Sequence, residues 1–106
     1  MTNLAPIISV IVAMAASSAS GQSLVGDFAQ GHALARKVCV ECHRVERGQA
    51  ADNSSAAPAF KAVADNPSTT ALSLRVFLRT PHRNMPNVML TESDTDDIIG
   101  YILSLK

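Results

Sequence analysis

Cys39-Val40-Glu41-Cys42-His43 is the stretch that decides the fold of this 106-residue chain. The pattern C-x-x-C-H is the attachment sequence for a c-type haem. Two intervening residues let both thiols reach one macrocycle, where they can add to the haem vinyl groups as thioethers. The adjoining His43 can then place a ring nitrogen on one face of the iron. The motif therefore predicts one haem c, covalently attached through Cys39 and Cys42, and one axial ligand.

Other kinds of site use the same pair of cysteines. A thioredoxin-like dithiol lies in a βαβ context, and no alternating β-branched run precedes Cys39. A zinc site needs four ligands, but the chain has no further cysteine, and His32 and His82 are isolated in the sequence. A disulfide between these cysteines would close a very short loop and stabilise little. Covalent haem is the favoured interpretation, with zinc, a redox dithiol and unused thiols as alternatives.

The N-terminal end differs in composition from the rest of the chain. Residues 4–16 are almost wholly apolar and are followed by small residues. This run is too short for a membrane span, which needs about 20 residues. We therefore expect a signal peptide over residues 1–21, cleaved between Ala19 and Gln22, and a single domain over residues 22–106. Because no lysine or arginine precedes the apolar run, an uncleaved membrane anchor is the alternative.

The predicted export places the protein in the periplasm and agrees with haem, since c-type haem is attached outside the cytoplasm. The remaining domain is small enough that a protein core alone is marginal. The chain has three phenylalanines, one tyrosine and no tryptophan, so a bound macrocycle would supply apolar bulk. The formal net charge is zero. The balanced charge therefore indicates neither a nucleic-acid partner nor binding to a membrane surface, and no stable membrane insertion is expected.

Charge is unevenly distributed along the chain. The basic side chains cluster around the haem motif and the acidic ones near the C-terminus: Arg36, Lys37, Arg44 and Arg47 in the first group, and Asp94, Asp96 and Asp97 in the second. One interpretation is a solvated surface with charges at helix ends. The other is a basic rim around the haem edge that docks an acidic redox partner.

A first helix is predicted to run into the haem motif, because apolar or small residues recur every three or four positions between Leu24 and Val38. Asp27 lies near its start, where the helix dipole favours an acid. Gly31 costs helix stability relative to alanine, which makes sense if another helix crosses closely there. Residues 44–57 are polar and rich in small side chains, so they predict a surface loop.

Two short helices are predicted in the middle of the chain. Pro58 suits the first position of one helix, which ends at Asn66-Pro67, and one of residues 68–70 caps the next, over residues 71–79. This helix is apolar around most of its circumference, so it packs on more than one side, and a macrocycle is a natural partner for one side. Its polar strip, either solvated or in contact with haem propionates, consists of Arg75 and Arg79.

The last helix has the clearest predicted start. Thr91 is a good N-cap residue, and Asp94 occupies the capping-box position. Acidic residues in the first turn complement the helix dipole. The apolar face is predicted to consist of Ile98, Tyr101, Ile102 and Leu105. No strand and no internal repeat is predicted, so the fold class is all-α.

The second axial position of the haem iron has four candidate ligands: Met85, Met89, His82 and His32. Met85 has prolines on both sides, in a stiff segment between two predicted helices that can hold a thioether against the iron. Met89 fits better as a core residue leading into the last helix. The residues favour Met85 and leave His82 as an alternative.

Four segments of the chain resemble the small class I bacterial cytochromes c. They are the helix over residues 31–35 with the haem motif, Ala57-Pro58-Ala59-Phe60, the segment Pro81 to Asn87, and the terminal run Tyr101 to Lys106. The resemblance implies about four short helices packed around one covalently attached haem.

The resemblance also implies roles for particular residues. Gly31 and Tyr101 would meet where the first and last helices cross. The Pro58 carbonyl would accept the ring proton of His43 and so orient the proximal ligand. Met85 would be the distal ligand.

An iron that binds His43 and Met85 has no open position, so it can pass single electrons but cannot readily bind a substrate. We therefore expect a monomeric periplasmic electron carrier, not an enzyme, whose donor and acceptor are larger redox proteins. One alternative is a fixed haem subunit of an oxidoreductase complex. Another, if Met85 is not a stable ligand, is a gas-binding or weakly peroxidatic haem protein.

Overall fold

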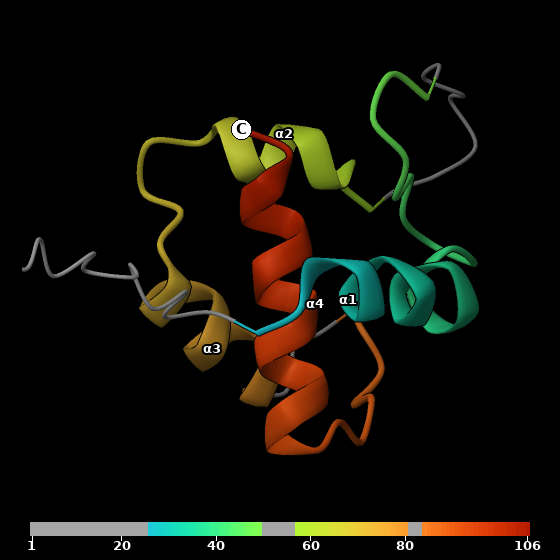
Figure 1. Cartoon of the computed structure of the whole chain (residues 1–106), viewed down its shortest axis with the longest axis vertical. Helices are drawn as coiled ribbons and strands as arrows, with labels where there is room; N and C mark the ends of the chain where they lie inside the picture. The colour runs from blue at the N-terminus through green and yellow to red at the C-terminus, as the bar shows by residue number, and fades with distance from the viewer. Residues whose placement is uncertain (1–25, 50–56, 81–83) are drawn as a thin grey trace, which may run out of the picture.

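The computed structural model describes residues 26–49, 57–80 and 84–106. The predicted signal peptide and His82 lie outside these ranges. The elements of the described residues are all helices (Figure 1): α1 (Phe28–Leu34), η1 (Ala35–Cys39), α2 (Phe60–Asp65), α3 (Ala71–Arg79) and α4 (Glu92–Ser104). The all-α class is confirmed.

α1 and η1 form one continuous helix that leads to the haem motif. The Asp27 side chain caps its start by accepting hydrogen bonds from the backbone N–H groups of Ala29 and Gln30, at 2.8 and 3.2 Å. The last turn, η1, is a wider π-helical turn, a form that often occurs at functional sites. It ends at Cys39, so the helix delivers the first cysteine of the motif.

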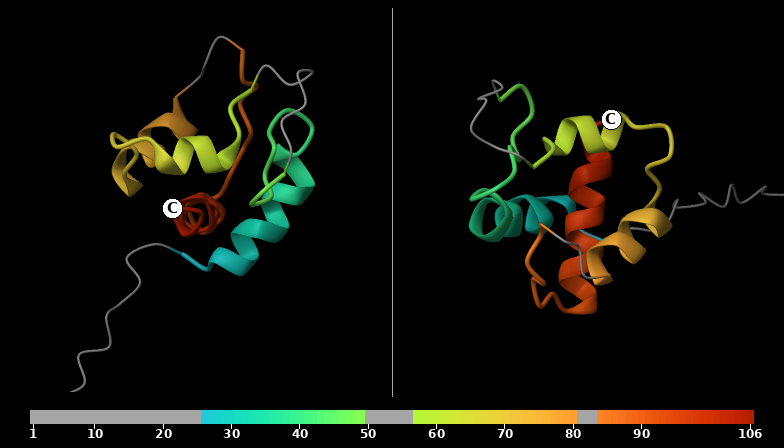
Figure 2. Two further views of the ribbon diagram at one scale, coloured as in Figure 1. Left: turned by 90° about the horizontal axis from the view of Figure 1, so that it is seen from above. Right: turned by 180° about the vertical axis from the view of Figure 1, so that it is seen from behind.

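α4 lies at the centre of the fold. It contacts α1, α2 and α3, and Figure 2 shows it end-on between α1 and α2. Thr91 caps α4 in a capping box with Asp94, as predicted. The buried apolar residues along it are Ile98, Ile99, Tyr101 and Ile102, followed by Leu105 after the helix. The predicted apolar face is thus the core of the domain.

α1 crosses α4 at a position where only glycine fits. A Cβ atom on Gly31 would lie 1.9 Å from the carbonyl oxygen of Asp97 and 2.9 Å from the Cβ of Tyr101. The expected crossing of the first and last helices at Gly31 and Tyr101 is therefore confirmed. Gly26, which the sequence did not single out, is also in close contact: its Cβ would lie 2.3 Å from Asp97 Oδ1.

α3 packs on the N-terminal half of α4 and differs in one respect from the sequence prediction. Leu74 is buried, as an apolar helix requires. Arg75 and Arg79, expected to be solvated or to reach propionates, are 36% and 45% exposed and also form ion pairs with Asp96 and Glu92 of α4, which the sequence did not predict. Acids in the first turns of α4 face them because the two helices lie side by side.

The ends of α2 and α3 refine two predicted caps. α2 begins at Phe60 with Ala59 as its N-cap, so Pro58 precedes the helix and does not occupy its first position. Its end at Asn66 agrees with the prediction. Thr70 caps α3 through a capping box with Ser73.

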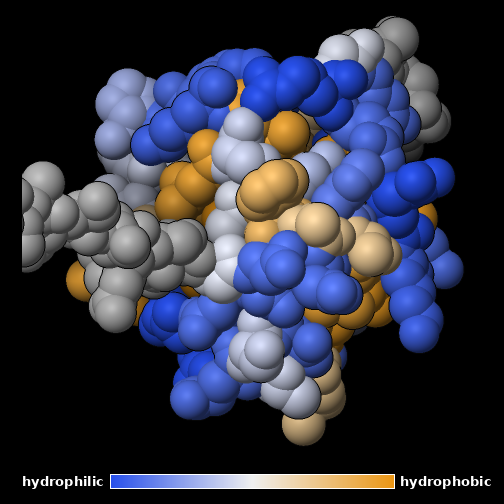
Figure 3. Space-filling view, in the orientation of Figure 1, coloured by the Kyte–Doolittle hydropathy of each residue, from blue (hydrophilic) through white to orange (hydrophobic). Residues whose placement is uncertain are grey.

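In the orientation of Figure 3, apolar side chains form separate patches bordered by hydrophilic ones.

Candidate functional site

His43 follows the turn formed by residues 40–42, which comes directly after η1. Its backbone N–H donates to the Cys39 carbonyl at 2.9 Å. Its ring Nδ1 lies 2.7 Å from the Pro58 carbonyl oxygen. Because a carbonyl can only accept, Nδ1 carries the proton, and in the neutral ring the lone pair is then on Nε2. The ring is thereby prepared to bind a metal through Nε2.

The Pro58 carbonyl is itself held in place by the chain on both sides. The backbone N–H of Phe60 donates to the Arg44 carbonyl at 2.9 Å. The Phe60 ring packs against the His43 ring, with centroids 5.2 Å apart. The segment after the motif and the segment before α2 therefore run together, and they orient the histidine by two contacts of different kinds.

The two cysteines are one turn apart and are not joined in a disulfide. Cys39 is partly buried and Cys42 is exposed. Burial raises the pKa of the Cys39 thiol above its ordinary value, whereas a reactive dithiol needs a lowered pKa. Residues 26–49, 57–80 and 84–106 contain no cluster of three or more His, Cys, Asp or Glu side chains that could together bind a metal ion. The structure thus gives no support to the dithiol or zinc alternatives.

Met85 lies in the extended segment between α3 and α4. It borders a small, mostly apolar cavity together with Phe77, Leu78, Val88 and Leu90. Such an apolar surface is what a macrocycle with a thioether ligand requires. The position of Met85 is thus compatible with the predicted distal role.

Met89 was expected in the core, and this expectation is wrong, since its side chain is 87% exposed. In an extended segment, alternate side chains point to opposite faces. Val88 and Leu90 are partly buried on the inner side, so Met89 between them points outward.

His32, another candidate ligand, is committed to other contacts. Its Nε2 lies 2.9 and 3.0 Å from the two carboxylate oxygens of Glu46, and Arg36 Nε lies 3.3 Å from the same carboxylate. The ring stacks on Tyr101 with centroids 4.6 Å apart. His32 therefore joins α1, α4 and the segment after the haem motif.

The segment after the haem motif is tied to α4, which the sequence did not reveal. Val45 is completely buried, and its carbonyl accepts a hydrogen bond from the Tyr101 hydroxyl. The prediction of a surface loop is therefore wrong at this residue. Burial and the nearby Glu46 carboxylate raise the pKa of Tyr101. The signal in the sequence for this burial was a single valine in a polar stretch.

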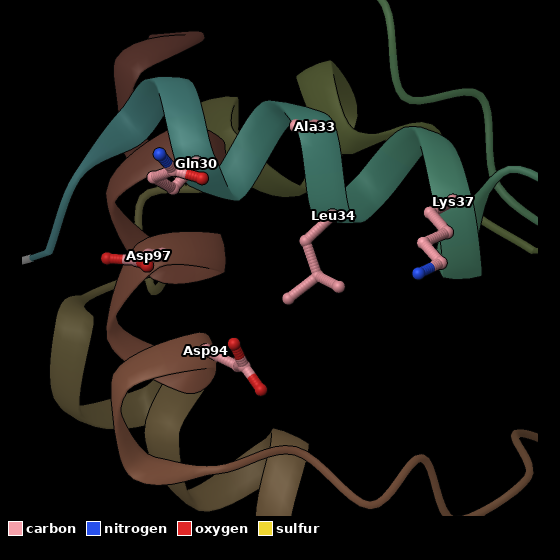
Figure 4. A pocket seen from close by; sticks show the side chains of 6 residues that line it. All are labelled: Gln30, Ala33, Leu34, Lys37, Asp94 and Asp97. Carbon is pink, nitrogen blue, oxygen red and sulfur yellow. The ribbon is translucent and has the colours of Figure 1, made fainter.

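The predicted basic cluster is only partly available to a partner. Arg36 pairs with Glu46, and Arg47 Nη2 donates to the Ser104 carbonyl at 2.7 Å. Lys37 borders an open groove of about 230 Å³ between α1 and the start of α4 (Figure 4). The acidic side chains of this groove are Asp94 and Asp97.

The sequence profile of the cytochrome c family matches residues 28–106. The chain belongs to the cytochrome c family. It is also similar to cytochrome c-552 of Bradyrhizobium diazoefficiens, with 36% identity over 97 residues that cover 92% of each chain. No solved structure gave a significant match.

Membership in the cytochrome c family implies a covalently bound haem c, and the residues of this chain fit that group. His43 donates its Nδ1–H to the Pro58 carbonyl, which leaves Nε2 for the iron. Cys39 and Cys42 lie one turn apart beside it. Met85 borders an apolar cavity. The fit therefore rests on donors of the right kinds and on the orientation of the histidine.

Proposed function

We propose that this cytochrome c is a periplasmic single-electron carrier with a six-coordinate haem. Cys39 and Cys42 attach the haem, and His43 and Met85 are its axial ligands. The observation that carries the proposal is the 2.7 Å hydrogen bond between His43 Nδ1 and the Pro58 carbonyl. This bond fixes the tautomer and the ring orientation that iron ligation through Nε2 requires.

The haem, when bound, supplies an iron that accepts and releases one electron. The protein residues set how easily this happens. The Pro58 carbonyl makes the His43 ring more basic by accepting a hydrogen bond from its Nδ1–H group. The Met85 thioether raises the reduction potential relative to a second histidine. With both positions filled, the iron has no open site for a substrate, so the proposed role is that of a carrier and not an enzyme.

The proposed partners are larger redox proteins that donate and accept the electron. A carrier must leave its partners quickly, so we expect small, weak interfaces and a monomer. The exposed Val38 and Val40 flank the first cysteine and would lie beside the proposed haem attachment.

None of the helices in the described ranges is long and apolar enough to cross a membrane. The periplasmic location is proposed from the composition of residues 4–16.

The absorption spectrum of the oxidised holoprotein tests the ligation. We expect a low-spin spectrum with a methionine-to-iron charge-transfer band. Met85→Ala should abolish the band, and the control Met89→Ala should keep it because that side chain is 87% exposed. A high-spin wild-type spectrum with ready binding of carbon monoxide would contradict the proposal and favour a gas-binding protein.

Mass spectrometry of the exported protein tests the attachment and the cleavage together. The expected mass is that of the chain without its N-terminal segment plus one haem. The double variant Cys39→Ser and Cys42→Ser should carry no covalent haem. Purification in strict stoichiometry with a larger oxidoreductase would instead identify the protein as a fixed subunit of a complex.

A further inference from the structure

Four aromatic rings form a continuous row from the surface of α1 to the proposed proximal ligand. The His32 ring stacks on Tyr101, with centroids 4.6 Å apart. Tyr101 contacts Phe60 at 6.3 Å, and Phe60 contacts His43 at 5.2 Å. The rings come from α1, α4, α2 and the haem motif. The row therefore joins a titratable side chain to the ligand through three ring contacts.

A second connection runs from His32 to His43 along the backbone. His32 Nε2 lies 2.9 Å from a carboxylate oxygen of Glu46, and Glu46 is three residues after His43. Between them, Val45 is anchored by the hydroxyl of Tyr101. Glu46 is thus joined to a short, anchored segment that begins at the ligand.

The charged and titratable groups around His32 are few. Glu46 belongs to the segment after the motif, Arg36 to η1 and Tyr101 to α4, and Arg47 lies near Tyr101. The side chains of His32 and Glu46 are 35% and 43% exposed, so His32 can exchange its proton with water. In general, an imidazole is the side chain that changes its charge between about pH 5 and 8.

We propose that His32 is a positioning residue that couples protonation to the reduction of the haem. The inference rests on the function proposed above. Protonated His32 holds the Glu46 carboxylate by a charge-assisted bond and places a positive charge at the end of the ring row. On reduction, the iron gains one electron from the donor, and His32 takes up a fraction of a proton from water.

The sign of the effect follows from electrostatics. A positive charge at the end of the ring row favours the ferrous form, which carries one more electron. Deprotonation of His32 leaves Glu46 balanced by Arg36 alone, so the ferric form is favoured and the reduction potential falls. Because both side chains are partly exposed, solvent screens the effect. We expect the ferric-to-ferrous ratio to change about twofold, which is about 18 mV at 59 mV per tenfold change.

The experiment measures the reduction potential of the holoprotein by spectroelectrochemical titration between about pH 5 and 8. The wild-type potential should fall by about 18 mV as the pH rises, which corresponds to the twofold change in the ferric-to-ferrous ratio. His32→Gln keeps a hydrogen-bond donor toward Glu46 but cannot titrate, so its potential should stay near the high-pH value. His32→Arg keeps a permanent charge, so its potential should stay near the low-pH value. The control His82→Gln should retain the wild-type profile.

The possible outcomes separate this inference from the proposed function. If His32→Gln retains the wild-type profile, or if the wild type shows no pH dependence, the coupling is wrong. If His82→Gln alone flattens the profile, another histidine is responsible and the coupling through His32 is overturned. Failure of the proposed function is seen independently, as a wild-type spectrum that lacks the methionine-to-iron band. If His32→Gln fails to retain haem, His32→Arg still tests the coupling. Its reduction potential should not change with pH, and a wild-type pH dependence in this variant would overturn the coupling.

Discussion

The segment after the haem motif and the segment that carries Met85 are held in different ways. Residues 44–47 are tied to three helices by directional contacts: the Tyr101 hydroxyl on Val45, the His32–Glu46 pair, Arg47 on the Ser104 carbonyl, and the Phe60 N–H on Arg44. Residues 84–90 instead face α3 with apolar side chains around a small cavity.

With His43 and Met85 as the proposed axial ligands, this difference predicts unequal rigidity on the two sides of the haem. Hydrogen bonds and ion pairs fix both distance and direction, whereas apolar burial is non-directional. The proximal side should therefore be rigid, and the distal side should yield first. A carrier benefits if its proximal ligand does not move between oxidation states.

The largest effect is expected at the helix crossing that supports the proximal side. Gly31→Ala places a Cβ 1.9 Å from the Asp97 carbonyl oxygen, so the helices must separate. The free energy of unfolding should fall by more than about 4 kcal/mol, with loss of most haem incorporation. The control is Gly48→Asn, because Gly48 has a φ of +73° and a Cβ there would meet no atom within 4 Å, and asparagine tolerates this φ. A stable Gly31→Ala holoprotein would refute the crossing.

Removal of the Tyr101 hydroxyl should weaken the proximal side alone. Tyr101→Phe leaves the buried Val45 carbonyl without its donor, which costs about 1–3 kcal/mol. Denaturant unfolding of the two holoproteins measures the difference. The Met85 charge-transfer band should remain at neutral pH. Loss of that band together with the stability would show that the two sides are not separate.

Tyr101 also predicts a pH dependence of stability. Burial raises its pKa above the ordinary value of about 10. A raised folded-state pKa means that folding favours the protonated phenol. The stabilisation is therefore complete below about pH 10 and is lost as the pH rises through the folded-state pKa. The difference in unfolding free energy between wild type and Tyr101→Phe should shrink above pH 10. A difference that grows with pH would contradict this sign.

On the distal side, Leu78→Ala should loosen Met85. Leu78 is partly buried and borders the same cavity as Met85, so its truncation should cost about 1–2 kcal/mol. An added ligand such as imidazole should then displace Met85 about tenfold more readily in a spectroscopic titration. Leu72→Ala is the matched control on the same helix, because Leu72 is 70% exposed. Equal effects of the two variants would show that the cavity does not support the ligand.

The smallest effect is expected at the exposed contact between α3 and α4. Arg79 Nη2 lies 3.0 Å from Glu92 Oε1, and exposed pairs of this kind contribute at most about 1 kcal/mol. Arg79→Gln should change the thermal midpoint little and leave the charge-transfer band intact. Loss of the band in this variant would mean that an ion pair, and not apolar packing, holds the distal side.

Most of the helical framework could be predicted from the sequence because its signals are local. Thr91 and Asp94 are three residues apart and form the predicted capping box. The bounds of α3 follow from the same kind of signal. The haem motif likewise lies within five residues. Each of these predictions needs only neighbouring side chains and the geometry of one turn.

The contacts that join distant segments could not be predicted. Tyr101 and Val45 are 56 residues apart, and a single valine in a polar stretch does not show which segment covers it. The outward direction of Met89 depends on the register of an extended segment, which a short apolar run does not specify. The pairing of His32 with Glu46 depends on how the chain turns after His43. These contacts are set by tertiary packing.

The most direct measurement follows the oxidised holoprotein through increasing guanidinium chloride with two signals. The methionine-to-iron band reports Met85 ligation, and far-UV circular dichroism reports the helices. We predict that the band is present at the start and disappears at a lower denaturant concentration than the helical signal. The absence of the band in native protein, or its loss only together with the helices, would contradict a His43/Met85 haem with a rigid proximal side and a yielding distal side.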